Sequence, residues 1–350
     1  MILAAGLLGV GAWLAQRRSH ASAFAPATAA ASAPPARAPT ASAPLAVPMD
    51  AARLESAKAQ AAARLWKLAF RAPAGEQTSP EVHRRVRDNV MAMLQAGSLD
   101  PLYLPRRPTL MPQLLQAVND PLAASERISR IIAHDPVLTA DVLRLANSSL
   151  FRSSPAPIET IQRAIVVCGA DALRGMLATA MLRPVFRATR RNFPRLPRML
   201  WERTERAARA AELYAMETNP RDRFEAQLVV LLGALGPLVV YSAALDVYAR
   251  NPLVEPSAAL CVELIDALAA QVSLRVARDW QSSARLTAAL EGAAAEPLTA
   301  ALHVGEFLGT LAFLESQTVI SPDERRGLVA DAGIAGESVN RIWAGLTGNA

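Results

Sequence analysis

The stretch "LVVLLGALGPLVV", residues 228–240, contains no ionisable side chain. The uncharged run is longer still, because twenty residues separate Glu225 from Asp246. A segment of that length could span a membrane. Two glycines, a proline and Gln227 interrupt its apolar character, however, and amphipathic helical patterns flank it. Because a membrane span here would divide a helical domain in two, we interpret the stretch as the buried core of that domain.

The composition predicts an all-α fold. Hydrophobic residues make up 52% of the 350 residues and aromatic residues only 5%. Alanine and leucine, which favour helices, dominate, whereas the residues that favour strands are scarce. The formal net charge is +6, and arginine carries nearly all the positive charge, since Lys58 and Lys67 are the only lysines. Such an excess permits an anionic partner without requiring one.

The first residues, "MILAAGLLGVGAWLAQRR" (1–18), predict a membrane anchor. As a helix, the apolar part is about 22 Å long, shorter than the roughly 30 Å hydrocarbon core. The arginines follow the apolar part, which predicts an uncleaved span with the domain in the cytoplasm. A cleaved signal peptide remains the alternative. Residues 19–50 form an Ala/Pro-rich linker with too few bulky side chains for a core. We therefore expect a protein tethered to the cytoplasmic membrane.

Helical periodicity begins near residue 50 and continues to the end of the chain. Residues 51–100 read as a helical extension that either docks a partner or only packs. A domain follows over 101–300, and C-terminal helices over 301–350 complete or flank it. We expect helices at 50–70, 80–96, 109–119, 125–133, 136–147, 158–167, 170–182, 198–217, 222–250 (broken at Pro237), 257–279, 282–291, 297–316, 321–333 and 337–347.

Residues 104–177 carry the most specific set of motifs, including "LRLANSS" at 143–149. As a set they resemble the HDOD domain, a helical module of bacterial signalling proteins that is related to HD-type phosphohydrolases. The resemblance implies a non-enzymatic signalling or scaffold protein that acts through protein contacts. The signature residues are Leu104, Pro105, Asp135, Pro136, Asn147, Ser148 and Gly169.

The signature residues also have a structural interpretation. Asp135 is a typical helix N-cap, and Pro136 fits the first helical turn. Asn147 and Ser148 end that helix, since asparagine tolerates the left-handed conformation found at helix ends. Gly169 separates two apolar helices. We therefore expect most of these residues to serve packing and capping rather than chemistry.

The related phosphohydrolases hold a divalent metal with a His-Asp pair in an apolar helix, an upstream His and a downstream Asp, and the metal activates water. The resemblance places Gly233 and Ala234 at the His-Asp pair and Arg203 at or near the upstream His. None of the three offers a metal ligand. The resemblance thus implies a degenerate site, no catalytic residue, no metal and no cofactor. The alternative, a phosphodiesterase with a displaced metal site, needs a His/Asp cluster that the sequence does not show.

A second hypothesis concerns arginines between Asp171 and Glu202, where the sequence has no acidic residue. Arginine forks suit phosphate, so this patch could bind a nucleotide, nucleic acid or an anionic membrane face. The simpler interpretation is a solvated helix end and loop. As partners we expect other signalling proteins, with an anionic lipid surface and a second copy of the chain as further candidates and nucleic acid disfavoured. The patch consists of Arg183, Arg187, Arg190, Arg191, Arg195 and Arg198.

Overall fold

All regular secondary structure among the described residues of the computed structural model is helical, as the composition predicts. The structure describes residues 50–70, 80–95, 108, 112, 132, 135–148, 150–151, 156–187, 192–251, 254–334 and 336–347. The predicted anchor and linker therefore lie outside the described residues. The helices are α1 (Ala51–Phe70), α2 (Pro80–Gln95), α5 (Pro136–Ala146), α6 (Ile161–Cys168), α7 (Ala170–Leu182), η1 (Arg183–Arg187), α8 (Leu196–Thr218), η2 (Pro220–Asp222), α9 (Arg223–Gly233), α10 (Leu235–Ala249), α11 (Ala258–Asp279), α12 (Ala284–Leu290), α13 (Pro297–Ser316), α14 (Pro322–Asp331) and α15 (Glu337–Thr347).

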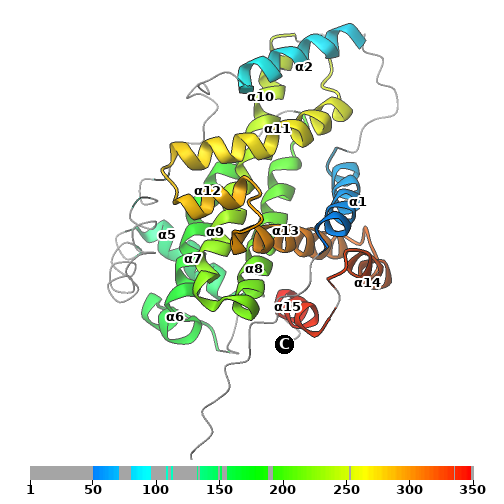
Figure 1. The fold of residues 1–350 in the computed structure, drawn as a ribbon. Coiled ribbons are helices and arrows are strands. Elements are labelled where there is room, and N and C mark those ends of the chain that lie inside the picture. Colours follow the sequence, from blue (N-terminus) through cyan, green and yellow to red (C-terminus); the bar gives the residue numbers. More distant parts are fainter. Residues whose placement is uncertain are drawn as a thin grey trace, which may run out of the picture. The chain divides into compact units, whose positions relative to one another are not determined.

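The core of the domain is built around two long helix pairs, α8 with α13 and α10 with α11 (Figure 1). Helix α9 packs against both pairs and against α7. The apolar stretch of residues 228–240 forms the second half of α9 and the first turns of α10, and nearly all of its side chains are buried. Its apolarity therefore reflects contact with other helices of the same chain, as the sequence predicts.

Among the described residues, two segments are long and apolar enough to cross a membrane, Pro220–Ala249 and Pro297–Ser316. In the first, 83% of the most apolar window is buried inside the chain, and in the second 72%. Core helices of a folded domain have these same properties. Burial by neighbouring helices thus accounts for both segments without a membrane.

The predicted position of the helix break, Pro237, is wrong. The helix is interrupted at Ala234, between α9 and α10. Pro237 lies in the first turn of α10, where its missing N–H would have no helical partner anyway. Ser273 of α11 stabilises the break. Its hydroxyl donates to the Gly233 carbonyl at 2.7 Å and accepts from the Gly236 N–H at 3.0 Å.

The signature residues within the described part of the chain are caps and turns. Asp135 accepts from the N–H groups of Val137 and Leu138 at 2.9 and 3.0 Å, with Pro136 in the first turn. Gly169, at φ 86°, separates α6 from α7 in a conformation that favours glycine. Ser148 donates to the Leu145 carbonyl at 2.7 Å.

Asn147 corrects one expectation, since its backbone is right-handed, with φ −92° and ψ −2°. The Asn147 side chain instead connects α5 to the loop before α6 by hydrogen bonds. The amide donates to the carbonyls of Leu143 and Ile158 and accepts from the Ile158 N–H, each at 2.8 Å. Asparagine is therefore required for its paired donor and acceptor rather than for backbone freedom.

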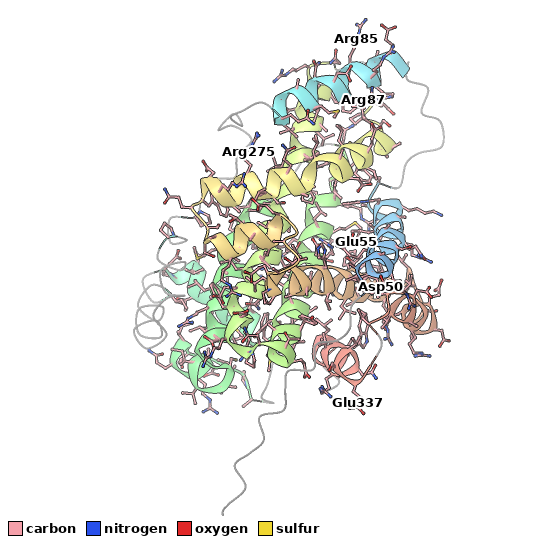
Figure 2. The ribbon with its side chains drawn as sticks, in the orientation of Figure 1. Asp50, Glu55, Arg85, Arg87, Arg275 and Glu337 are labelled. Carbon is pink, nitrogen blue, oxygen red and sulfur yellow. The ribbon has the colours of Figure 1, made fainter. Side chains whose placement is uncertain are left out.

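The helical extension packs on the domain. Helix α1 buries Leu54, Ala57, Ala61 and Leu65, spaced at three and four residues, and lies against α13, α14 and α8. Helix α2 packs on α10 and α11, and Arg85 points away from them (Figure 2). The extension is thus part of the same packed unit.

Candidate functional site

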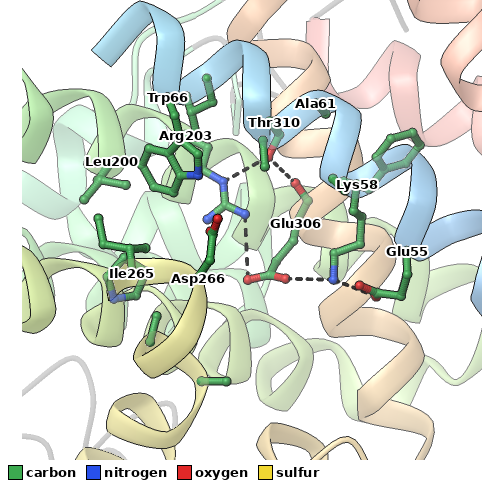
Figure 3. Close-up of a pocket in the computed structure, with 17 residues that line it drawn as sticks. Glu55, Lys58, Ala61, Trp66, Leu200, Arg203, Ile265, Asp266, Glu306 and Thr310 are labelled. Carbon is green, nitrogen blue, oxygen red and sulfur yellow. Dashed lines mark hydrogen bonds and ion pairs between the residues drawn. The ribbon is translucent and has the colours of Figure 1, made fainter. Parts of the chain in front are cut away.

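A pocket of about 340 Å³ opens where α1 lies over α8, α11 and α13 (Figure 3). Its walls are largely apolar and include Leu65, Leu200 and Phe307. Charged groups gather along one side, and they come from helices far apart in the sequence. The polar lining residues are Glu55, Lys58, Trp66, Arg203, Asp266, Glu306 and Thr310.

Lys58 is the centre of the charged side. Its Nζ lies 2.7 Å from His303 Nδ1, 3.0 Å from Glu55 Oε1 and 3.3 Å from Glu306 Oε2. A lysine ammonium has three N–H donors, so these three acceptors can satisfy all of them. Glu55 and Lys58 lie one turn apart on α1, and His303 and Glu306 lie one turn apart on α13. Lys58 therefore joins the two helices.

Arg203 of α8 approaches Glu306 from the other side. Its Nε donates to the Thr310 hydroxyl at 2.9 Å, and its Nη2 lies 3.7 Å from Glu306 Oε1. The Thr310 hydroxyl in turn donates to the Glu306 carbonyl at 2.6 Å. Glu306 thus lies between two cations, one from α1 and one from α8.

The electrostatics of this cluster follow from burial and from these cations. Burial alone would raise the pKa of Glu306, but Lys58 and Arg203 outweigh it, so that the pKa lies below its ordinary value. Burial and then the charge of Lys58 lower the pKa of His303, which leaves the imidazole neutral at pH 7. Burial raises the pKa of Asp266, across the pocket. The carboxylate of Glu306 and the neutral ring of His303 both suit contact with an ammonium.

The structure brings two of the three residues that the resemblance assigns to the HD position, Gly233 and Arg203, near this cluster. A Cβ placed on Gly233 would lie 3.9 Å from Glu306 Oε1, the atom that Arg203 faces. Gly233 and Arg203 are thirty residues apart in sequence, yet both face the same carboxylate. Ala234 is buried at the break between α9 and α10.

The residues around the pocket do not fit a bound metal ion as they stand. In the described part of the chain, no group of three or more His, Cys, Asp and Glu side chains could hold a metal. Gly233 and Ala234 have no ligand atom, and an ammonium lies among the carboxylates and the imidazole that remain. His134, which precedes Asp135 in the sequence, lies outside the described residues.

Sequence reasoning did not find Lys58, Glu55 or Glu306. His303 is half-buried within this cluster. The three acceptors and Lys58 come from α1 and α13, separated by more than two hundred residues, so no local spacing links them. One signal was available, because Lys58 is one of only two lysines in an arginine-rich chain.

Only part of the arginine patch lies among the residues that the structure describes. Arg190, Arg191 and the side chain of Arg187 lie outside what the structure describes. Arg195 and Arg198 are exposed, and Arg198 lies 3.7 Å from Glu202 on its own helix. Arg183 is half-buried. These placements fit a solvated helix end and do not assemble a phosphate site among the described residues.

The sequence model of the HDOD domain family matches residues 104–294, and the chain therefore belongs to that family. Among solved structures, an HDOD domain protein of unknown function from Geobacter sulfurreducens is 19% identical, with a TM-score of 0.49, covering 77% of this chain and 98% of its own. A protein from Shewanella amazonensis, provisionally named a metal-dependent phosphohydrolase, is 14% identical, with a TM-score of 0.50, covering 76% of this chain and 98% of its own. At these identities the likeness concerns the fold and not the activity. No curated protein matches significantly.

Proposed function

We propose that this HDOD protein is a non-enzymatic signalling or scaffold protein that acts through contacts with other proteins. The observation that supports this is the pair of cations at Glu306. Lys58 lies 3.3 Å from one oxygen of this carboxylate, and Arg203 lies 3.7 Å from the other. Gly233 faces the same carboxylate without offering a ligand. This arrangement supports the proposal, because the protein's own positive charges lie at the carboxylate beside Gly233, which the resemblance aligns with the ligand pair of HD-type enzymes.

The physical argument against metal-assisted hydrolysis concerns charge and ligands together. A catalytic metal site takes about three protein ligands and keeps one position open for water. Here, two of the candidate ligands already accept hydrogen bonds from Lys58. A divalent ion would also lie close to two positive charges, and Coulomb repulsion at such distances is strong in a partly buried site. The rival hypothesis, a phosphodiesterase with a displaced site, therefore lacks a ligand set among the described residues.

The first prediction tests catalysis directly. The purified full-length protein, without a polyhistidine tag, should contain no stoichiometric divalent metal by elemental analysis. It should also show no hydrolysis of cyclic dinucleotides or simple phosphate esters with added Mn²⁺ or Zn²⁺, while an HD-type phosphodiesterase assayed alongside turns them over. About one metal per chain with turnover above the buffer rate would overturn the proposed function.

The second prediction concerns location, because we also propose that residues 1–18 tether the domain to the cytoplasmic face of the membrane. The apolar run followed by Arg17 and Arg18 supports this. The full chain should remain in the membrane pellet after alkaline carbonate washing, whereas a chain that begins at residue 19 should be released. Equal distribution of both chains, or release of a shortened mature form, would contradict the tether and support signal cleavage.

A further inference from the structure

The pocket beneath α1 has room for a small ligand. Its volume of about 340 Å³ falls within the range of small-molecule pockets. Small side chains on α1 and α11 leave this space open, because larger residues at the same positions would fill it. These residues are Ala59, Ala61, Ala62, Ala269 and Ala270.

The charges that line the pocket do not cancel. Lys58 pairs with Glu55 at 3.0 Å and with Glu306 at 3.3 Å. Arg203 lies 3.7 Å from the other oxygen of Glu306. Asp266 of α11 is the remaining charged residue of the lining, and it forms no ion pair with a described residue. Both cations of the lining are thus neutralised by carboxylates, and the Asp266 carboxylate is in excess.

Trp66 of α1 lies beside Asp266 (Figure 3). Burial raises the pKa of Asp266, and the Trp66 indole N–H partly offsets this rise. The same N–H is buried and makes no well-aligned hydrogen bond to a described residue. An aromatic ring attracts a cation, and a carboxylate does so more strongly, so an ammonium placed here would gain from both groups.

We propose that this pocket binds a small organic cation, a primary amine with an apolar body about the size of phenethylamine. The ammonium pairs with Asp266 beside Trp66, and the apolar body lies against Leu200 and Ile265, which line the same space. An anionic ligand is disfavoured, because Glu55 and Glu306 already neutralise Lys58 and Arg203.

Helix α1 forms one wall of this pocket, and it lies outside residues 104–294, which match the family. The site therefore depends on a segment that the family match does not include. The inference goes beyond the proposed function and does not rest on it, because binding of an amine requires neither catalysis nor a protein partner.

The experiment compares three probes of nearly equal shape by isothermal titration calorimetry at pH 7, with the untagged full-length protein in detergent. Phenethylamine carries a positive charge, 2-phenylethanol none and phenylacetate a negative one. Phenethylamine should bind with a dissociation constant of about 1 mM or less. The alcohol should bind about tenfold more weakly or worse, since a hydrogen bond to a charged group contributes at least that factor, and phenylacetate should bind most weakly.

Variants of the lining place the binding in this pocket. Asp266→Asn should weaken phenethylamine about tenfold or more and leave 2-phenylethanol unchanged. Asp279→Asn, an exposed carboxylate at the end of the same helix and outside the lining, should bind as the wild type does. The double variant Ala62→Leu with Ala270→Leu fills the space from both helices and should weaken the amine and the alcohol alike. Partition of a probe into detergent is common to all variants.

The proposal is overturned if phenethylamine binds no more tightly than 2-phenylethanol, or if phenylacetate binds more tightly than either. It is also overturned if the affinity for the amine is unchanged in Asp266→Asn or survives the double leucine variant. Asp266 is exposed, so Asp266→Asn should fold, which circular dichroism checks. The comparison of the three probes uses the wild-type protein alone and decides the question even where a variant does not fold.

Discussion

Replacing Gly309 by alanine should destabilise the protein by about 3 kcal/mol or more, since overpacking against backbone is among the costlier core changes. Gly309 lies on α13 where that helix packs on α8. A Cβ at this position would lie 2.3 Å from both the Cα and the backbone nitrogen of Ala207 and 2.6 Å from its Cβ. Backbone atoms cannot rotate away as a side chain can, so the two helices would have to separate.

The matched control is Gly327→Ala on α14. A Cβ there would have no atom within 4 Å, and the residue is exposed within a helix. Alanine should therefore stabilise the protein by about 0.5–1 kcal/mol, because glycine costs that much in a helix interior. Urea unfolding followed by circular dichroism measures both changes.

A second variant distinguishes the contact of the new Cβ with the Ala207 backbone from its contact with the Ala207 side chain. Ala207→Gly removes only the 2.6 Å contact and leaves the two 2.3 Å contacts with the backbone of α8. It should therefore restore little of the stability lost in Gly309→Ala. Full rescue by Ala207→Gly, or a loss below about 1 kcal/mol for Gly309→Ala alone, would show that α8 and α13 lie farther apart than the structure places them.

This crossing also positions the candidate site. Arg203 lies on α8, and Glu306 and Thr310 lie on α13, one turn before and one residue after the contact point at Gly309. The short distance between the helices brings the Arg203 guanidinium within 2.9 Å of the Thr310 hydroxyl. Gly309→Ala should therefore disturb the cluster around Glu306 even at temperatures where the protein remains folded.

Much of the fold could be predicted from the sequence, because helix signals are local. The expected helices at 170–182, 297–316 and 337–347 agree with α7, α13 and α15. Gly169 before α7 and Pro297 in the first turn of α13 mark two of their starts. The break at Ala234 could not be predicted in this way. It depends on Ser273 of α11, a helix forty residues further along the chain.

The candidate site likewise contains some residues that could be predicted from the sequence and others that could not. Arg203 and Gly233 could be proposed because a family resemblance assigns a role to their positions. Lys58, His303 and Glu306 could not, since ion pairs between distant helices leave no periodic pattern in the sequence. Gln227 illustrates the same limit. In the sequence it only interrupts an apolar run, but in the structure it donates to a buried carboxylate, that of Glu212, at 3.0 Å.

Replacing Glu212 by alanine should cost about 3–5 kcal/mol, the loss expected when one member of a buried ion pair is removed. Glu212 of α8 is 1% exposed. Its two oxygens accept from Arg209 and Arg223, each at 2.7 Å, and from the Gln227 amide. Without the Glu212 carboxylate, the largely buried guanidinium groups of Arg209 and Arg223 would each lose this ion pair.

The arrangement also explains the glycine at position 175. A Cβ there would lie 1.4 Å from Gln227 Oε1, so the glycine leaves room for the amide that completes the Glu212 network. The network connects α8 to α9, the helix that ends at Gly233. A change at Glu212 should therefore propagate toward the apolar helix at the centre of the domain.

Glu217→Ala, five residues further along α8, is the matched control for Glu212→Ala. Glu217 pairs with Arg341, and its side chain is 29% exposed against 2% for that of Glu212, so its loss should cost less than about 1 kcal/mol. The difference between the two variants isolates the effect of burial from that of charge. Glu212→Gln keeps the shape and one acceptor oxygen, and its stability should lie between those of the wild type and Glu212→Ala. If Glu212→Ala and Glu217→Ala lose equal stability, the arginines must reach solvent when Glu212 is absent, and the buried network would contribute no more than an exposed ion pair.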